Sequence, residues 1–223
     1  MKELLFYIEL GEDENFSEYL KFLNFLTPEK QMRIHKFKFA IDKKLSLFSD
    51  LFVRYFACKV LNLSNSDLFF GKNAYGKPYL VDYPDFNYSI SHTKNAIAIG
   101  FSEISIGVDI ERIKPSDMKI AERFFCKNEF EYIVSKEDQE RLFCEVWTKK
   151  EAYIKWIGKG LSLSLTAFDI TDIEIANMFR TIKIDNYLIS VCSKNRLNKM
   201  DINELSEREV FQIFTEFTSS SGQ

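Results

Sequence analysis

The stretch Trp147-Thr148-Lys149-Lys150-Glu151-Ala152-Tyr153-Ile154-Lys155 lies in a segment that we predict to be one long helix, from Glu137 to Ile157. Residues four apart share a helix face, so Trp147, Glu151 and Lys155 form a single stripe. Gly158 directly follows the segment, in the position of a left-handed helix cap. A carboxylate and an ammonium group are therefore presented side by side on one helix face.

An earlier segment, Gly107-Val108-Asp109-Ile110-Glu111, reads as a strand. Residues two apart share a strand face, so Asp109 and Glu111 point the same way while Ile110 points into the core. If this strand meets the long helix, three carboxylates and a lysine converge on one spot. Carboxylate oxygens suit a divalent cation, and a lysine beside them suits a phosphate. The rest of the chain is interpreted as the support for that spot.

Composition bounds the class of protein. The chain has 223 residues, enough for one large domain or two lobes of about 100 residues each. It is 46% hydrophobic with 22 Phe, which is ample material for a packed core. A net charge of −3 argues against duplex nucleic acid as the main partner, because domains that bind it are usually basic.

Cysteine and histidine usage excludes a zinc site of the Cys/His type. Cys58, Cys126, Cys144 and Cys192 are scattered, and the chain has only two histidines. The N-terminus does not have the pattern of a signal peptide, and no apolar run approaches the roughly 18 residues of a membrane span. We therefore expect a soluble cytoplasmic protein with reduced thiols and no membrane partner.

The chain divides into two halves, and each mixes helices with a small sheet. We predict an α+β fold with an N-terminal lobe over residues 1–103 and a C-terminal lobe over residues 104–223. The tip from Thr218 to Gln223 is small and polar, so we expect it to be disordered. The expected strands are 3–10, 86–91, 96–101, 106–112, 167–170, 179–184 and 187–193, and the expected helices are 15–26, a short one from Pro28, 42–63, 116–124, 128–135 and 137–157.

Several motifs are weak when each is taken alone. Lys30 and Arg33 belong to a short basic helix, which by itself indicates a solvated face. A Gly-rich turn places Lys77 on a rigid loop before Pro78. The segment Ser91-His92-Thr93 could bind phosphate oxygens or could simply be a turn. In the same way, Glu151 and Lys155 alone would be an ordinary helix pair.

Taken in order, the motifs resemble the 4′-phosphopantetheinyl transferase superfamily, in its two-lobed surfactin-synthetase-activating type. The resemblance runs from the short basic helix to Leu165, which is most of the chain. The motifs that carry it are Thr27-Pro28-Glu29-Lys30, Tyr75-Gly76-Lys77-Pro78, Phe86-Asn87-Tyr88-Ser89-Ile90-Ser91-His92-Thr93, Gly107-Val108-Asp109-Ile110-Glu111, Phe124-Phe125-Cys126-Lys127-Asn128-Glu129, Trp147 through Lys155, and Lys159-Gly160-Leu161.

The resemblance implies a holo-[acyl-carrier-protein] synthase. Such an enzyme moves the phosphopantetheine arm of coenzyme A onto a serine of an acyl or peptidyl carrier protein and releases 3′,5′-ADP. It also implies a monomer of two α+β lobes, related by a pseudo-twofold axis, with coenzyme A in the cleft between them. Fatty acid, polyketide and nonribosomal peptide carriers all stay open as partners, and the segment 114–129 is a candidate for contact with them.

The family's site residues carry over position by position. Asp109, Glu111 and Glu151 would hold Mg²⁺ on the pyrophosphate. Glu151, directly or through a metal-bound water, would help to deprotonate the carrier serine, and Lys155 would stabilise the pyrophosphate during the attack. The residues that the resemblance assigns to coenzyme A are Lys30, Arg33, Ser46, Lys77, Ser91, His92 and Lys155, with Lys30, Arg33 and Lys77 around the 3′-phosphate and adenine.

One segment departs from the family pattern. The long helix of the first lobe usually has the pattern D-x-x-R-x-x-x-G, whereas this chain has Leu45 and Ser49 at the arginine and glycine positions. We expect Lys44 or Ser46 to take over the nucleotide contact. Two other functions fit some of the same residues: a Mg²⁺-dependent nuclease or nucleotide hydrolase, and a carrier-binding module without catalysis.

Overall fold

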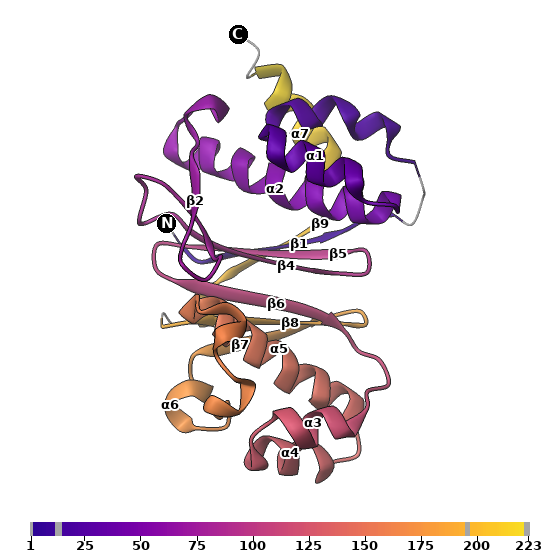
Figure 1. Ribbon diagram of the computed structural model, residues 1–223, viewed down its shortest axis with the longest axis vertical. Coiled ribbons are helices and arrows are strands. Elements are labelled where there is room, and N and C mark those ends of the chain that lie inside the picture. Colours follow the sequence, from indigo (N-terminus) through magenta and orange to yellow (C-terminus); the bar gives the residue numbers. More distant parts are fainter. Residues whose placement is uncertain (1, 12–14, 195–196, 221–223) are drawn as a thin grey trace.

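The computed structural model describes residues 2–11, 15–194 and 197–220 (Figure 1). Its two larger sheets lie one above the other at the centre of the molecule, with helices on both outer sides. Both lobes combine helices and strands, so the predicted α+β class is confirmed. Within the described residues, no helix is long and apolar enough to cross a membrane.

The first sheet has four strands in the order β4-β5-β1-β9, and the second has three in the order β6-β8-β7. Antiparallel pairing dominates, and only β1 and β9 run parallel. A small hairpin, β2-β3, lies beside the first sheet. The strands are β1 (Leu4–Glu9), β2 (Phe70–Lys72), β3 (Pro78–Leu80), β4 (Asn87–Thr93), β5 (Ala96–Ser102), β6 (Ile106–Arg112), β7 (Phe179–Ile184), β8 (Tyr187–Ser193) and β9 (Asp201–Ser206).

Helices of the first lobe cover the outer face of its sheet, and those of the second lobe gather on the opposite side of the molecule (Figure 1). The α-helices are α1 (Pro28–Lys36), α2 (Ala40–Leu61), α3 (Met118–Phe124), α4 (Lys127–Val134), α5 (Gln139–Ile157), α6 (Ile173–Ala176) and α7 (Glu207–Ser220). The 3₁₀ helices are η1 (Ser17–Phe25), η2 (Asn65–Asp67), η3 (Gly160–Ser162), η4 (Leu165–Ala167) and η5 (Leu197–Lys199).

The first core lies between α2 and the first sheet and is rich in phenylalanine. Phe48 and Phe52 project from α2 and are almost fully buried. Phe56 stacks on Phe101 of β5, with ring centroids 4.1 Å apart. A second core fills the space between the two sheets, where Leu5 and Tyr7 of β1 belong to the same cluster as Val108 and other residues of the second sheet. The lobes are therefore joined by apolar packing as well as by polar contacts.

The helix α5 lies directly on strand β6 because position 107 is a glycine. A Cβ atom there would be 1.9 Å from the Ala152 carbonyl oxygen and 2.5 Å from the Trp156 amide nitrogen. The same strand face carries Asp109 and Glu111, so this close approach brings both carboxylates beside the helix. The helix ends at Gly158, whose φ of 74° is the predicted left-handed cap.

The end of the chain returns to the first lobe. We expected residues 104–223 to form the second lobe, but β9 pairs with β1 and α7 packs against α2 and η1. Part of the tip expected to be disordered, 218–220, is the last turn of α7, and 221–223 lie outside the described residues. Side-chain and sheet contacts with the first lobe thus decide where this segment folds.

Lys44, one of the two residues predicted as alternatives for the nucleotide contact, is buried inside the first lobe. Its side chain is fully buried, and its ammonium group lies 2.9 Å from the Glu207 carboxylate at the start of α7. Glu207 also accepts hydrogen bonds from the Tyr19 hydroxyl, at 2.6 Å, and from the Gly11 amide. A buried lysine engaged in this way is unavailable to a ligand, so Ser46 is left as the predicted polar contact.

The predicted strand at 167–170 is absent because side chains occupy its backbone groups. The ammonium group of Lys150, which is fully buried, donates to the carbonyl oxygens of Leu165 and Phe168. It also pairs at 2.7 Å with Glu129, whose carboxylate accepts from the Ile170 amide. With these groups already satisfied, the segment has no need of a strand partner.

Candidate functional site

The predicted carboxylates lie where strand β4 of the first lobe faces strand β6 of the second. Strands β4 and β6 are each at the edge of their own sheet, and they are not paired by backbone hydrogen bonds. Side-chain hydroxyls of β4 contact β6 instead. The Ser91 hydroxyl donates to Asp109 Oδ1 at 2.7 Å, and the Thr93 hydroxyl donates to Glu111 Oε2 at 3.2 Å. Residues of the first lobe therefore hold both carboxylates of strand β6.

Helix α5 adds the other two charged groups. Lys155 Nζ donates to Asp109 Oδ1 at 2.8 Å, so the strand and the helix do meet. Asp109 Oδ2 is buried, and within the described residues no hydrogen-bond donor reaches it. Glu151 is partly buried, and the charges of Asp109, Lys155 and Glu111 act on it. The site thus contains at least one carboxylate oxygen, Asp109 Oδ2, that the fold itself does not satisfy.

The carboxylates disfavour each other's charge. Burial raises the pKa of Glu111, and the negative charge of Asp109 raises it further. Burial likewise raises the pKa of Glu151, again with Asp109 as the next cause. Burial lowers the pKa of His92, and the positive charges of Lys155 and Arg33 add to that effect. A cation at the carboxylates would relieve their mutual repulsion.

The donor set fits Mg²⁺ in its chemistry, although it is not closed around an ion. Among the residues that the structure describes, no three His, Cys, Asp or Glu side chains form a ready-made metal site. Mg²⁺ takes oxygen ligands and normally keeps several waters, so two or three carboxylates suffice. The buried, unpartnered Asp109 Oδ2 is the observation that favours such an ion, because that oxygen has lost water and gained no donor.

Three hollows are lined by residues of the site or of the strands and helix that carry it. The basic hollow, in the first lobe, has Arg33, Ser46 and His92 among its lining residues. The junction hollow, between the lobes, includes Glu151 and Lys155 together with Tyr75, Lys77 and Pro78. The junction hollow thus has a predicted metal ligand in its own lining, whereas the basic hollow is connected to the site through His92 of strand β4.

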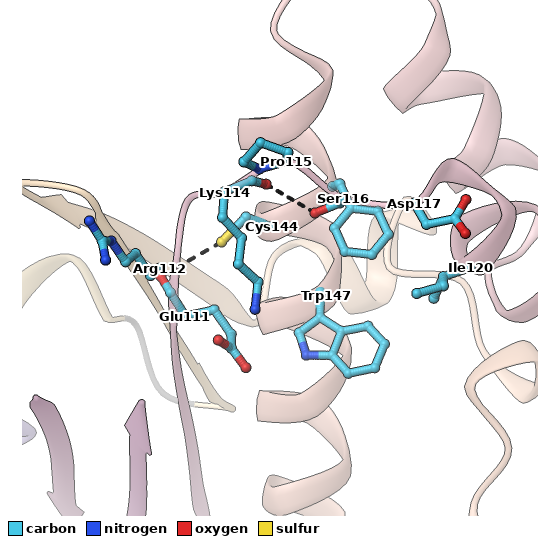
Figure 2. Close-up of a pocket in the computed structure, with 10 residues that line it drawn as sticks. Glu111, Arg112, Lys114, Pro115, Ser116, Asp117, Ile120, Cys144 and Trp147 are labelled. Atoms are coloured by element: carbon cyan, nitrogen blue, oxygen red, sulfur yellow. Dashed lines mark hydrogen bonds between the residues drawn. The ribbon is translucent and has the colours of Figure 1, made fainter. Parts of the chain in front are cut away.

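The apolar hollow lies in the second lobe, with Trp147 and Phe143 in its wall (Figure 2). In Figure 2, the side chains of Glu111 and Lys114 extend toward the Trp147 ring. Trp147 also stacks on Phe143, with ring planes 10° apart, as expected for a residue that packs the helix in place. An uncharged, elongated group could lie here with one end at Glu111.

The remaining predicted residues are already engaged within the chain. Lys30 pairs with Asp50 at 2.8 Å. Lys77 Nζ is buried between the lobes, where it donates to Ser105 Oγ and to the carbonyl oxygens of Ile106 and Trp156, at 3.1 to 3.3 Å. Burial lowers the pKa of Lys77 to about 8. The structure thus places the Lys77 amine at the lobe junction, in a residue that lines the junction hollow.

Thr93 is the site residue that we did not single out from the sequence. The Ser-His-Thr segment as a whole was a candidate for contact with phosphate oxygens, but only Ser91 and His92 were then assigned to a ligand. A signal was present: Ser89, Ser91 and Thr93 alternate along one strand, which places three hydroxyls on one face. That pattern predicts a polar contact along the strand but does not identify its partner.

Comparisons with known proteins give one consistent result. A family model described as 4′-phosphopantetheinyl transferase superfamily matches residues 105–214, and one described as 4′-phosphopantetheinyl transferase, N-terminal, matches residues 14–103. The chain is 32% identical over 216 residues to 4′-phosphopantetheinyl transferase Sfp of Bacillus subtilis, covering 90% of this chain and 95% of that protein.

Two further relatives extend the comparison. The 4′-phosphopantetheinyl transferase gsp of Aneurinibacillus migulanus is 35% identical over 210 residues, or 87% of this chain and 88% of that protein. The L-aminoadipate-semialdehyde dehydrogenase-phosphopantetheinyl transferase of Mus musculus is 32% identical over 178 residues. That match covers 73% of this chain and 57% of the mouse protein.

Proposed function

The chain belongs to the 4′-phosphopantetheinyl transferase superfamily, and we propose that it transfers the phosphopantetheine arm of coenzyme A to a serine of an acyl or peptidyl carrier protein. The observation that supports this reaction best is the meeting of Asp109, Glu111, Glu151 and Lys155 where the lobes join. Three carboxylates and one ammonium group that lie close together suit a reaction that breaks a pyrophosphate bond. The chain is accordingly an enzyme of the holo-[acyl-carrier-protein] synthase type.

Mg²⁺ is the proposed metal, and Asp109, Glu111 and Glu151 would hold it. When bound, it would neutralise the charge of the pyrophosphate and so favour attack by an oxygen nucleophile. The free Asp109 Oδ2 and the raised pKa values of Glu111 and Glu151 support this choice, because both point to uncompensated negative charge. Lys155 pairs with Asp109 and would be a further positive charge for the same phosphate oxygens.

Glu151 is the proposed general base. Its carboxylate is partly buried within electrostatic range of Asp109, and it would act either directly or through a metal-bound water. It would take the proton from the carrier serine hydroxyl as the serine oxygen bonds to the β-phosphorus. The bond from that phosphorus to the bridging oxygen breaks, and 3′,5′-ADP leaves with the bonding electrons. Lys155 would stabilise the charge that develops on the leaving group.

Coenzyme A would span the hollows. Arg33, Ser46 and His92 line the basic hollow and would meet phosphate oxygens there, with Lys30 held nearby by Asp50. The adenine end would rest on the loop that contains Lys77, in the junction hollow. The uncharged pantetheine arm fits the apolar hollow, which begins at Glu111 and is walled by Trp147. Ser91 would act mainly by orienting Asp109, because its hydroxyl already donates its hydrogen bond to that carboxylate.

The test is a transfer assay with the whole chain. Incubation with coenzyme A, Mg²⁺ and a panel of apo carrier proteins should add the phosphopantetheine mass to the carrier, and a carrier with serine replaced by alanine should gain nothing. Chelation of the metal should stop transfer. A folded enzyme that modifies no carrier in the panel would refute the proposal. Release of phosphate or nucleotide without a carrier would instead identify a hydrolase.

The proposal also includes a monomeric, cytoplasmic enzyme without nucleic-acid or membrane partners. Light scattering during size-exclusion chromatography measures the oligomeric state directly. A mass of two or more chains would refute the monomer.

A further inference from the structure

Strand β4 presents a row of three hydroxyls to the second lobe. Ser89, Ser91 and Thr93 share one strand face, and each has a partner on β6. Ser89 Oγ accepts from the Val108 amide at 2.9 Å, and the other two hydroxyls donate to Asp109 and Glu111. The partners stand at positions 108, 109 and 111 of β6, so the first lobe contacts the carboxylate strand along most of its second half.

We propose that Thr93 is a positioning residue for Glu111, so that the first lobe contributes to metal binding by the second. The inference rests on the proposed function, in which Glu111 is a metal ligand. Carboxylates that bind metals are usually oriented by hydrogen bonds from neighbouring groups, and loss of such a bond commonly weakens metal affinity 10- to 100-fold. Thr93 occupies that place in the geometry, with its hydroxyl 3.2 Å from Glu111 Oε2.

The two carboxylates of β6 differ in how firmly they are held. Asp109 has a short side chain and two donors, Ser91 and Lys155. Glu111 has one more rotatable bond, and within the described residues Thr93 is its only side-chain hydrogen-bond donor. Thr93 is itself branched at Cβ, which restricts its rotamers, and it lies at the last position of a paired strand. Loss of the Thr93 hydroxyl should therefore increase the mobility of the Glu111 carboxylate more than loss of the Ser91 hydroxyl would increase that of Asp109.

The test compares three variants of the full chain saturated with coenzyme A, whose own dissociation constant is measured for each variant because Ser89 and Thr93 line hollows proposed to hold it. Thr93→Val removes the hydroxyl and keeps the branched shape, whereas Thr93→Ser keeps the hydroxyl. Ser89→Ala is the matched control, because Ser89 lies on the same strand face but bonds to a backbone amide. The readout is the dissociation constant of Mn²⁺, measured by paramagnetic resonance, and competition by Mg²⁺. Thermal unfolding without metal reports the stability of each variant.

We expect Thr93→Val to weaken metal binding at least roughly 10-fold and Thr93→Ser to recover an affinity within about threefold of the wild type. Ser89→Ala should lower thermal stability and leave the metal affinity unchanged. Wild-type affinity in Thr93→Val, or equal weakening in Thr93→Ser, would overturn this inference and leave the proposed function standing. A wild-type chain that binds no metal would overturn both the magnesium assignment and the inference.

Discussion

Asp109 uses its two oxygens differently, and this asymmetry defines the site at the scale of single residues. Oδ1 accepts from Ser91 and Lys155, whereas Oδ2 is buried and lacks a donor among the described residues. A buried oxygen without a partner costs about 1–3 kcal/mol, so the fold alone would not select it. Glu111 and Glu151 have raised pKa values because they are partly buried and lie near the negative charge of Asp109. The site is electrostatically unfavourable in the free protein.

Glu151→Gln should therefore remove activity without weakening the fold. We expect transfer to fall by about 10²-fold or more, since the amide cannot accept the serine proton. At pH 7 the melting temperature should stay level or rise, because an acid with a raised pKa is destabilising when ionised. Mass spectrometry of the carrier and thermal unfolding measure the two effects. Glu145→Gln, on the same helix and paired with Arg141 and Lys149, is the control and should keep its activity.

Lys77 should give the protein a defined pH dependence. Its pKa is about 8 in the folded state, against an ordinary value of 10.5. Between those values the unfolded chain holds the proton and the folded chain has released it, so rising pH favours the folded state at this residue. In urea unfolding at pH 7.5, 8.5 and 9.5, the stability of the wild type relative to Lys77→Met should increase steadily. A constant or decreasing difference would contradict the burial of the Lys77 charge.

At the scale of elements, the site depends on how closely β6 lies against α5. The glycine at position 107 allows backbone-to-backbone contact with the helix turn that contains Ala152. Asp109 and Glu111 follow on the same strand face, so the strand–helix separation sets their distance from Glu151. Across the strand, the hydroxyls of β4 complete the contact. Three elements from both lobes thus determine the geometry of one cluster of charges.

Gly107→Ala should destabilise the second lobe and impair transfer together. The new methyl group would overlap the Ala152 carbonyl, which belongs to a helix backbone and cannot rotate away. Overpacking of this kind costs about 1–3 kcal/mol, and we expect the upper end or beyond. Gly71→Ala is the control, because its Cβ would meet the ring of Tyr79, which is half-exposed and free to move. Equal losses of unfolding free energy in the two variants would refute the explanation.

At the scale of the whole molecule, the chain closes on itself. Strand β9 lies parallel to β1, and α7 packs on the helices of the first lobe, so both ends of the chain stabilise one sheet (Figure 1). Glu207 joins this closure through Lys44, Tyr19 and Gly11. The first lobe is therefore built from two separate parts of the chain, its N-terminal part and the C-terminal segment with β9 and α7, and the second lobe lies between them in sequence. Removal of the C-terminal segment would expose the first core.

Glu207→Ala should lower the free energy of unfolding by about 3–5 kcal/mol, the usual effect of breaking a buried ion pair. The Lys44 side chain is fully buried and Glu207 is 14% exposed, so solvent screens little of the interaction. Asp201→Ala is the matched control: it breaks an ion pair with Lys2 that also joins the chain ends but is more than half exposed. That change should cost less than about 1 kcal/mol. Urea unfolding distinguishes the two, and comparable losses would contradict the argument.

Sequence patterns predicted most of the local structure and the charged cluster. The strand period of two put Asp109 and Glu111 on one face, and the helix period of four put Glu151 and Lys155 on another. Both are short-range properties, and the structure agrees with them: β6 spans 106–112 and α5 ends at residue 157. The ordered motifs then identified the family, because several spaced matches rarely occur together by chance.

Tertiary structure alone decided which partners the polar side chains take. Lys44 and Glu207, Lys77 and the Trp156 carbonyl, and Thr93 and Glu111 are pairs of residues far apart in the chain. No local period specifies such contacts; they arise only when both lobes are packed and each buried polar group must find a donor or acceptor. The sequence by itself thus determined which chemical groups the site contains. The fold determined which of them are held by the protein and which oxygens are left for a ligand.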